Sequence, residues 1–107
     1  MIIRLSRWNV LPEYEEAAVN RWEEQLLPHT YAACDGLIEA SFLGDPQGSE
    51  RIAFTAWHSE EAYAAALRQG VLSRITEDFR PMYVDGRPPV PRAYTRLAGR
   101  RYAGGAL

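Results

Sequence analysis

The sequence has little that would direct the protein out of the cell or into a membrane. It has one cysteine, Cys34, so no disulfide can form within the chain. No apolar run approaches the roughly 20 residues that a membrane-spanning helix needs. Near the N-terminus, Arg4 and Arg7 interrupt the apolar stretch that a secretory signal requires. We therefore expect a cytoplasmic protein.

Motifs that would identify common activities are also absent. The chain has no G-x-S-x-G motif, no glycine-rich phosphate loop and no G-x-G-x-x-G fingerprint, which argues against the usual hydrolase, nucleotide and dinucleotide classes. A net charge of −2 argues against nucleic acid as a partner, because that binding depends on cationic contacts with phosphate. His29, His58 and Cys34 lack the spacing of a metal site. The sequence thus predicts no metal and no nucleic-acid partner.

Alternation of apolar and polar residues marks the strands. Its period of two predicts strands over residues 2–10, 37–43, 51–57 and 92–97. The turn-forming residues 44–48 lie between the second and third strands, which predicts an antiparallel hairpin there.

A period near 3.6 marks two helical regions. The first begins near Glu13, and we expect Pro28 to kink or divide it, because proline lacks an amide donor and crowds the preceding turn. The second begins after Ser59, which can cap a helix N-terminus, and breaks at Gly70. A further helical segment is predicted within residues 71–83, and we expect it to stop near Pro81.

The order of these elements is β-α-β-β-α-β. This order predicts an α+β, ferredoxin-like fold with an antiparallel sheet. At 107 residues the chain has room for one modest core. We expect a single domain over residues 1–97 and a C-terminal tail over residues 98–107.

Both faces of the predicted sheet carry apolar side chains. Apolar residues of the two middle strands fall on both sets of alternating positions: Ile38, Phe42, Ile52 and Phe54 on some, and Leu37, Leu43, Ala53 and Trp57 on others. Two helices can cover only one face of a four-stranded sheet, whereas antiparallel sheets usually leave the other face polar. A second copy of the chain would cover the remaining face, so the sequence predicts a homodimer.

Residues 51–66 form the stretch in which we expect the chemistry. The third strand ends at Trp57, and the helix after Ser59 turns back over the sheet. Glu60 and Glu61 follow, where the positive end of the helix dipole favours acidic side chains. Such a corner between strand and helix can line a pocket.

At this corner the sequence resembles a known family. Residues 57–63, WHSEEAY, resemble the W-x-S-x-E-A stretch of the antibiotic biosynthesis monooxygenase (ABM) domain, and residues 35–38, DGLI, resemble its P-G-F turn. The resemblance implies a dimeric α+β barrel, in which two ferredoxin-like sheets pack face to face. Family members include cofactor-free oxygenases of polyketide quinols, quinol monooxygenases, haem-degrading enzymes and proteins without a known role.

The resemblance also implies site residues. Trp57 and Tyr63 match a tryptophan at the end of the third strand and a tyrosine on the following helix of the cofactor-free oxygenases. Those enzymes tend to have an asparagine earlier on the strand, where this chain has Ala53 or Thr55. They also have a later arginine, for which this chain offers only Arg74 or Arg80.

The predicted site follows from these matches. Trp57, Tyr63 and His58 are the candidate catalytic residues, and Trp57, Tyr63, Asn9 and Thr55 are the candidate substrate-binding residues. The haem-degrading members bind iron through a histidine on the second helical region. No histidine follows His58, so we expect no haem, flavin, metal or other cofactor.

Two interpretations of the function follow. In the first, the homodimer is a cofactor-independent monooxygenase in which oxygen reacts directly with the anion of a small aromatic or quinol-type substrate. Trp57 stacks on that substrate, Tyr63 binds its oxygen, and His58 is a candidate for proton transfer. In the second, the barrel is non-catalytic and binds a small ligand or serves assembly, with Trp57 and Tyr63 in the core and His58 exposed. An isomerase or lyase acting through His58 is a third possibility.

Overall fold

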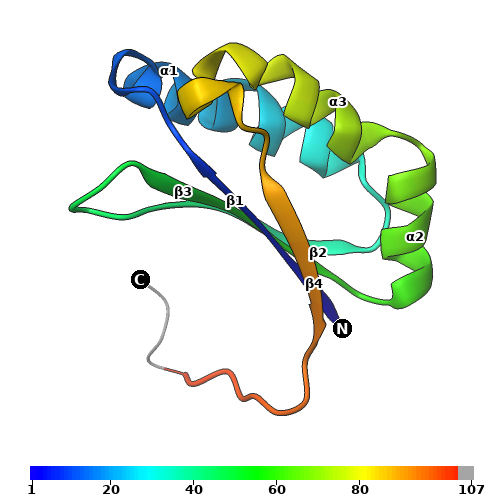
Figure 1. Cartoon of the computed structure of the whole chain (residues 1–107). Coiled ribbons are helices and arrows are strands. Elements are labelled where there is room, and N and C mark those ends of the chain that lie inside the picture. Colours follow the sequence, from blue (N-terminus) through cyan, green and yellow to red (C-terminus); the bar gives the residue numbers. More distant parts are fainter. Residues whose placement is uncertain (104–107) are drawn as a thin grey trace.

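The computed structural model describes residues 1–103, and residues 104–107 of the predicted tail lie outside the described part of the chain. Figure 1 shows the layered arrangement of sheet and helices. The elements in chain order are β1 Ile2–Asn9, η1 Pro12–Tyr14, α1 Glu15–Arg21, η2 Trp22–Thr30, η3 Tyr31–Ala33, β2 Leu37–Gly44, β3 Glu50–Trp57, α2 Glu60–Arg68, α3 Val71–Asp78, η4 Arg80–Met82, η5 Val84–Gly86 and β4 Val90–Thr95.

The strands form one antiparallel sheet in the order β2-β3-β1-β4. The helices lie together over one face of this sheet (Figure 1). This α+β, ferredoxin-like architecture confirms the predicted fold class and the hairpin of β2 and β3. Within residues 1–103, no helix combines the length and apolarity needed to cross a membrane.

The strand register decides which side chains face the helices. In the pairing of β1 with β3, Ile2 lies opposite Trp57, Arg4 opposite Thr55 and Ser6 opposite Ala53. The buried residues Ile2, Ser6, Trp57 and Thr55 belong to these pairs, so this is the covered face. Because successive residues of a strand point to opposite faces, Arg4 is a charged residue on the face that is otherwise buried.

A β-bulge changes the predicted faces of β2. The register of β2 with β3 shifts between Leu37 and Glu39, so Leu37, Ala40 and Phe42 share the helix-covered face. The uninterrupted alternation expected from the sequence, which placed Ile38 on the face of Phe42, was wrong at this point. One extra residue in a strand turns every following side chain to the other face.

Of the two outcomes expected at Pro28, division of the first helical region was wrong, and a kink there stays a prediction. The chain runs from α1 directly into η2, a π-helix that contains Pro28, and the Tyr31 N–H donates to the Leu26 carbonyl five residues earlier. The wider π turn accommodates the proline ring that would crowd an α-helical turn.

The second helical region begins as the sequence predicts. Ser59 Oγ accepts a hydrogen bond from the Ala62 N–H at 3.1 Å, and Gly70 separates α2 from α3 with a φ of 75°. The further helical segment stops near Pro81 as predicted: α3 ends at Asp78, and a 3-10 turn containing Pro81 follows. The last strand begins two residues earlier than predicted, at Val90, and therefore includes Pro91.

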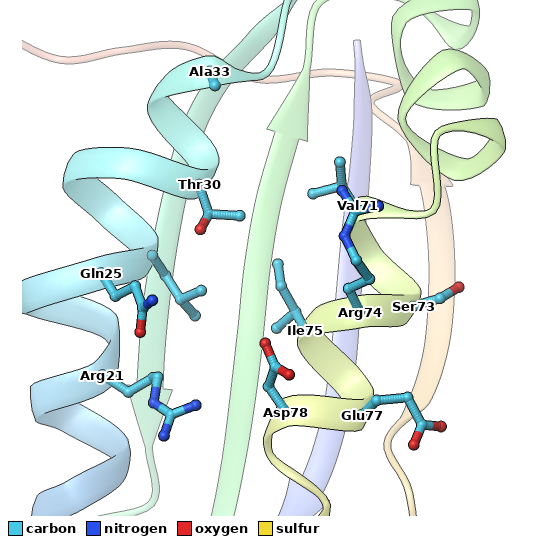
Figure 2. Close-up of a pocket in the computed structure, with 11 residues that line it drawn as sticks. Arg21, Gln25, Thr30, Ala33, Val71, Ser73, Arg74, Ile75, Glu77 and Asp78 are labelled. Atoms are coloured by element: carbon cyan, nitrogen blue, oxygen red, sulfur yellow. The ribbon is translucent and has the colours of Figure 1, made fainter.

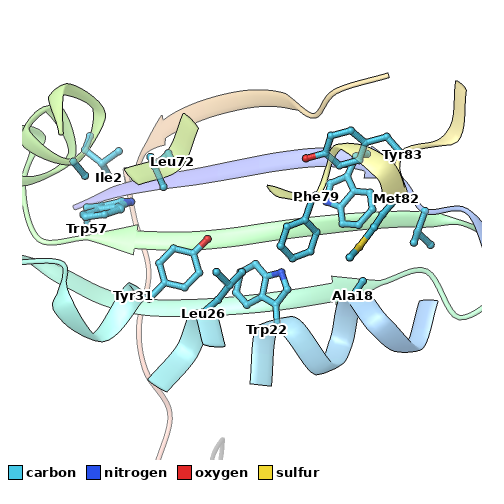
Figure 3. Close-up of a cluster of buried hydrophobic side chains, with 13 residues drawn as sticks. Ile2, Ala18, Trp22, Leu26, Tyr31, Trp57, Leu72, Phe79, Met82 and Tyr83 are labelled. Atoms are coloured by element: carbon cyan, nitrogen blue, oxygen red, sulfur yellow. The ribbon is translucent and has the colours of Figure 1, made fainter. Parts of the chain in front are cut away.

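Aromatic side chains fill most of the space between sheet and helices (Figure 3). Trp22 of η2 stacks on Phe42 of β2 with 5.1 Å between ring centroids and 10° between planes. Trp8 of β1 meets Phe79 and Tyr83 edge-on at 5.8 and 5.1 Å. These contacts hold the helices over the sheet at fixed positions.

The other face of the sheet has no helix over it (Figure 1). Apolar side chains on this side or at its margins remain well exposed, namely Ile38 at 46 %, Leu43 at 46 %, Val90 at 64 % and Tyr94 at 46 %. Leu5 and Phe54, which pair across β1 and β3, are only half-buried. The apolar pattern predicted for this face is therefore present, and residues 1–103 place no helix over it.

Candidate functional site

A small cavity, here called the inner pocket, lies between the sheet and α3. Its volume is about 30 Å³. It is lined mainly by aromatic side chains and by a few polar ones: Arg4, Ser6, Trp8, Trp22, Tyr31, Ala53, Leu72, Ile75, Thr76, Phe79, Tyr83 and Pro89. This volume holds a water molecule but no aromatic ring, since a cavity of about 150 Å³ is what accommodates benzene.

The inner pocket leads into a wider one, here called the mouth pocket. The mouth pocket has a volume of about 290 Å³ and is bordered by α3 and the start of β4. The two pockets share five lining residues: Arg4, Ser6, Leu72, Thr76 and Pro89. Glu77 and Pro91 border the mouth pocket but not the inner pocket. The mouth pocket is large enough for a small aromatic compound, which would meet Arg4 and Ser6 at its inner end.

Two tyrosines supply hydroxyl groups to this region. Burial raises the pKa of Tyr31 well above its usual range, and the nearby Arg4 charge opposes part of that rise. Burial likewise raises the pKa of Tyr83, whose hydroxyl donates to the Thr76 carbonyl at 2.7 Å. Both phenols therefore stay protonated near neutral pH and can act only as neutral hydrogen-bonding groups. The Tyr31 hydroxyl points toward the sheet (Figure 3).

Arg4 is the cationic residue shared by the inner pocket and the mouth pocket. Its Nε is buried and has no hydrogen-bond partner among the described residues. Ion pairs elsewhere in residues 1–103 join Arg7 to Glu50, Arg51 to Glu15 and Arg80 to Glu77, and none includes Arg4. A cation at the end of an aromatic-walled cavity can attract the developing negative charge of a bound substrate.

A second hollow, here called the outer groove, lies between η2 and α3 (Figure 2). Its volume is about 530 Å³, and polar side chains such as Gln25, Thr30 and Asp78 line much of it. The Arg21 guanidinium lies 5.7 Å from the centroid of the Phe79 ring, at the boundary of the core. The outer groove touches the inner pocket through Ile75.

Neither candidate for the later arginine lies in the inner pocket. Arg74 lines the outer groove, and its Nη1 donates to the Gln69 carbonyl at 3.3 Å. Arg80 is exposed and forms an ion pair with Glu77 at 2.7 Å.

The structure brings Trp57, Thr55 and Tyr63 together. Trp57 is completely buried, and its indole N–H donates to the hydroxyl of the buried Thr55 at 2.9 Å. The Tyr63 ring lies 5.9 Å from the Trp57 ring, measured between centroids. Neither ring lines the inner pocket, the mouth pocket or the outer groove within residues 1–103. Thr55 lies opposite Arg4 in the sheet, so this group is next to a residue of the inner pocket but does not line the pocket itself.

His58 and Asn9 lie apart from that group. His58 is exposed and lines a separate surface pocket of about 290 Å³ together with Cys34 and Ser59, and its backbone N–H donates to the Gly36 carbonyl at 2.7 Å. Asn9 lies at the other end of β1 from Ile2 and is exposed. Its Oδ1 accepts a hydrogen bond from the Ser49 hydroxyl at 3.0 Å. Seven residue-to-residue steps along the strand separate it from Ile2, a distance of about 23 Å.

Sequence reasoning did not find the residues of the inner pocket. Arg4 of β1, Tyr31 of η3 and Tyr83 between η4 and η5 are far apart in the chain, and only the tertiary fold brings them to one pocket. One signal was present. Arg4 occupies an alternating position between Ile2 and Ser6, where an amphipathic strand would place a buried side chain.

Comparisons with known proteins relate the fold to solved structures. A monooxygenase from the ActVA-Orf6 gene of Streptomyces coelicolor, in complex with nanaomycin D, has a TM-score of 0.76 and 14 % identity, covering 95 % of this chain and 92 % of its own. SnoaB, a cofactor-independent oxygenase from Streptomyces nogalater, was solved as a variant and has a TM-score of 0.66 and 16 % identity, covering 92 % and 94 %.

A third structure, described as an antibiotic biosynthesis monooxygenase, has a TM-score of 0.71 and 8 % identity, covering 92 % of this chain and 100 % of its own. No protein-family model matches the sequence, and no curated protein matches it. At these identities the likeness shows a shared fold. The resemblance to ABM proteins that the sequence suggested is thereby confirmed at the level of the fold.

Proposed function

We propose that the protein is an ABM-like monooxygenase that oxidises a small aromatic or quinol-type substrate with dioxygen and without a cofactor. The substrate binds in the mouth pocket, with its reacting ring toward the inner pocket. The observation that carries this proposal is the cavity between sheet and α3, with its aromatic wall, its unpaired Arg4 and its protonated tyrosines. The fold is that of ActVA-Orf6, named as a monooxygenase, and of SnoaB, named as a cofactor-independent oxygenase.

The reaction needs no external reductant. An activated CH₂ group between oxygen-bearing rings loses a proton, and the resulting carbanion bonds to one atom of dioxygen. The C–O–O⁻ group takes up a proton, then the O–O bond breaks as the second C–H proton leaves, forming C=O and water. The balance is R₂CH₂ + O₂ → R₂CO + H₂O, in which the carbon supplies all four electrons. The protein contributes orientation and stabilisation of the anion.

Trp57 and Thr55 act in this proposal as positioning residues. Their buried hydrogen bond fixes the part of β3 that lies opposite Arg4. Tyr63 packs against Trp57 and keeps the indole in place. His58 and Asn9 stand outside the pocket, so the proposal gives them no contact with the substrate.

We further propose that two chains associate through their open sheet faces as a homodimer. The half-buried Leu5 and Phe54 would form the centre of the interface, with Leu43 and Tyr94 nearer its margins. Exposed apolar patches of this kind mark interaction sites. The domain boundary at residue 97 and a cytoplasmic location remain predictions.

Oxygen uptake with anthrone- and naphthalenediol-type quinols, with and without a chelator, tests the proposed activity. We expect uptake that survives the chelator, consumes one O₂ per carbon converted to C=O (the CH₂ of an anthrone, or the ring carbon that is CH₂ in the keto form of a naphthalenediol) and leaves no hydrogen peroxide. Pro91→Trp, which fills the mouth pocket, should lower kcat/KM at least about tenfold, a change of about 1.4 kcal/mol in the barrier. Gln25→Trp fills only the outer groove and is the matched control. Equal loss in both variants would contradict the placement of the site.

A non-catalytic, ligand-binding barrel is the second candidate, and one observation favours it. The inner pocket, at about 30 Å³, is too small for a ring, so its own side chains occupy the space beneath α3. In that case the quinols would quench tryptophan fluorescence on binding, and no oxygen would be consumed by any member of the panel. Oxygen consumption that depends on the protein would remove this candidate.

A further inference from the structure

Arg4 occupies a position that the fold would be expected to give to an uncharged side chain. Its neighbours on the same face of β1, Ile2 and Ser6, are 7 % and 4 % exposed. The residue opposite in β3, Thr55, is 2 % exposed. Arg4 itself is half-buried. Charged residues on such a face normally have an ionic partner, because even partial removal of a charge from water is costly.

The structure supplies no such partner for Arg4. Its Nε is buried without a hydrogen bond, and no ion pair includes it among residues 1–103. Glu77, the carboxylate that borders the mouth pocket, is bound through both oxygens by Arg80, at 3.0 and 2.7 Å. The hydroxyl of Thr76 donates to the Leu72 carbonyl within α3. An unpaired donor in a buried site destabilises the protein until a partner fills it.

The charge of Arg4 faces a space that a ligand can reach. Arg4 and Ser6 line both the inner pocket and the mouth pocket, so they stand where the two meet. A guanidinium offers five N–H donors in a planar fork, which suits two oxygens of a carboxylate or one oxyanion on a flat ring. The aromatic wall beside it suits the flat ring itself.

We propose that Arg4 is the anion-binding residue of this pocket and that the ligand is an aromatic compound carrying an ionised oxygen next to the ring. Ser6 provides a neighbouring hydroxyl at the same end. The inference rests on the proposed function in one respect, that the pocket binds the oxygenase substrate. In the oxygenase reaction, Arg4 holds the substrate in its ionised form, which is the form that reacts with dioxygen. The pocket therefore selects acidic quinols over neutral aromatic compounds.

The ionised oxygen could be a carboxylate substituent or the phenolate of the reacting ring. Equilibrium binding to the full-length protein is therefore measured for 2-naphthoate, for its neutral counterpart 2-naphthamide, and for 2-naphthol on both sides of its own pKa. Tryptophan fluorescence quenching and calorimetry provide the dissociation constants. Tighter binding of naphthoate identifies a carboxylate site, and binding of naphthol that tightens only on ionisation identifies a phenolate site.

The variant Arg4→Gln tests the residue directly. It should weaken binding of the preferred anion about 10- to 100-fold, the range expected for hydrogen bonds to a charged group, while binding of the carboxamide changes less than about twofold. Arg4→Lys, which keeps the charge but not the fork, should retain part of the affinity. Arg68→Gln, at an exposed arginine of α2 that lines neither pocket, is the matched control and should bind as the parent does.

A readout on the intact protein covers the case in which Arg4→Gln does not fold. The Arg4 Nε–H resonance, assigned by its loss in Arg4→Lys, should shift when naphthoate or naphtholate is added and stay in place with the carboxamide. Equal affinity of parent and Arg4→Gln for the anions, or an unmoved Nε resonance at saturation, overturns the inference. Oxygen uptake by the parent protein in that case would leave the proposed oxygenase function standing. Anion binding that depends on Arg4 without any oxygen uptake supports the inference and overturns the oxygenase.

Discussion

Replacing Thr55 with valine should destabilise the protein through a single buried hydrogen bond. Thr55 Oγ1 accepts from the indole N–H of Trp57 at 2.9 Å, and the two residues are 2 % and 0 % exposed. Valine has nearly the same shape, so the substitution leaves the packing in place and the indole N–H without an acceptor. A buried donor left in this state costs about 1–3 kcal/mol. For a domain of this size each kcal/mol lowers Tm by about 4–8 °C.

Urea denaturation followed by tryptophan fluorescence, at one fixed protein concentration, measures this cost. Thr95→Val removes a hydroxyl from an exposed position of β4 and is the matched control, expected within about 0.5 kcal/mol of the parent. Adding Trp57→Phe completes a double-mutant cycle. Since either substitution removes the hydrogen bond, their losses of unfolding free energy should be less than additive, with a coupling energy of about 1 kcal/mol. A Thr55→Val protein as stable as the parent, or fully additive changes, would refute the reasoning.

Two further predictions concern the backbone and the assembly. Gly36→Ala should destabilise the protein by more than about 2 kcal/mol in the same urea assay, because left-handed backbone costs a β-carbon about 1–2 kcal/mol and the new atom would lie 2.5 Å from the Ala62 Cβ. Gly86→Ala meets no atom within 4 Å and should show only the backbone cost; equal effects would contradict the clash. Phe54→Arg should halve the molar mass measured by light scattering if the open sheet face is the dimer interface, whereas Glu23→Arg on η2 should not. A parent protein that is already monomeric would remove the dimer proposal.

Local signals in the sequence were sufficient for most of the fold. Ser59 marked the start of α2 because a short hydroxyl side chain can cap free N–H groups, and the cap is present at 3.1 Å. Gly70 marked the end of a helical segment, and it has a positive φ angle of 75°. These features depend on a few neighbouring residues, so the sequence can reveal them.

Features that depend on packing escaped prediction. Pro28 reads as a helix breaker, but η2 adopts a π-helical form in which the ring fits. The bulge between Leu37 and Glu39 is visible only in the pairing with β3. The last strand was predicted from residue 92, yet β4 also includes Pro91, because β4 is an edge strand that pairs only with β1, where a proline is tolerated.

The candidate site was predictable only in part, for the same reason. Trp57, Thr55 and Tyr63 lie within nine consecutive residues, and strand and helix periods place them together at one corner. Asn9 is far from them because β1 runs antiparallel to β3, so that Ile2, and not Asn9, lies opposite Trp57. The pocket beside Arg4 requires the spacing between α3 and the sheet, which no local pattern encodes.

The two-sided sheet constrains how the gene can change. In β1 and β3, alternate residues serve the pocket and the open face, so Arg4 and Leu5 are neighbours in sequence with opposite surroundings. Deleting or inserting one codon within either strand exchanges the two sets, directing pocket residues outward and interface residues inward. The turn between β2 and β3, at residues 45–49, carries no such coupling. Variation in length among natural relatives should therefore collect at that turn, while the strands change by substitution alone.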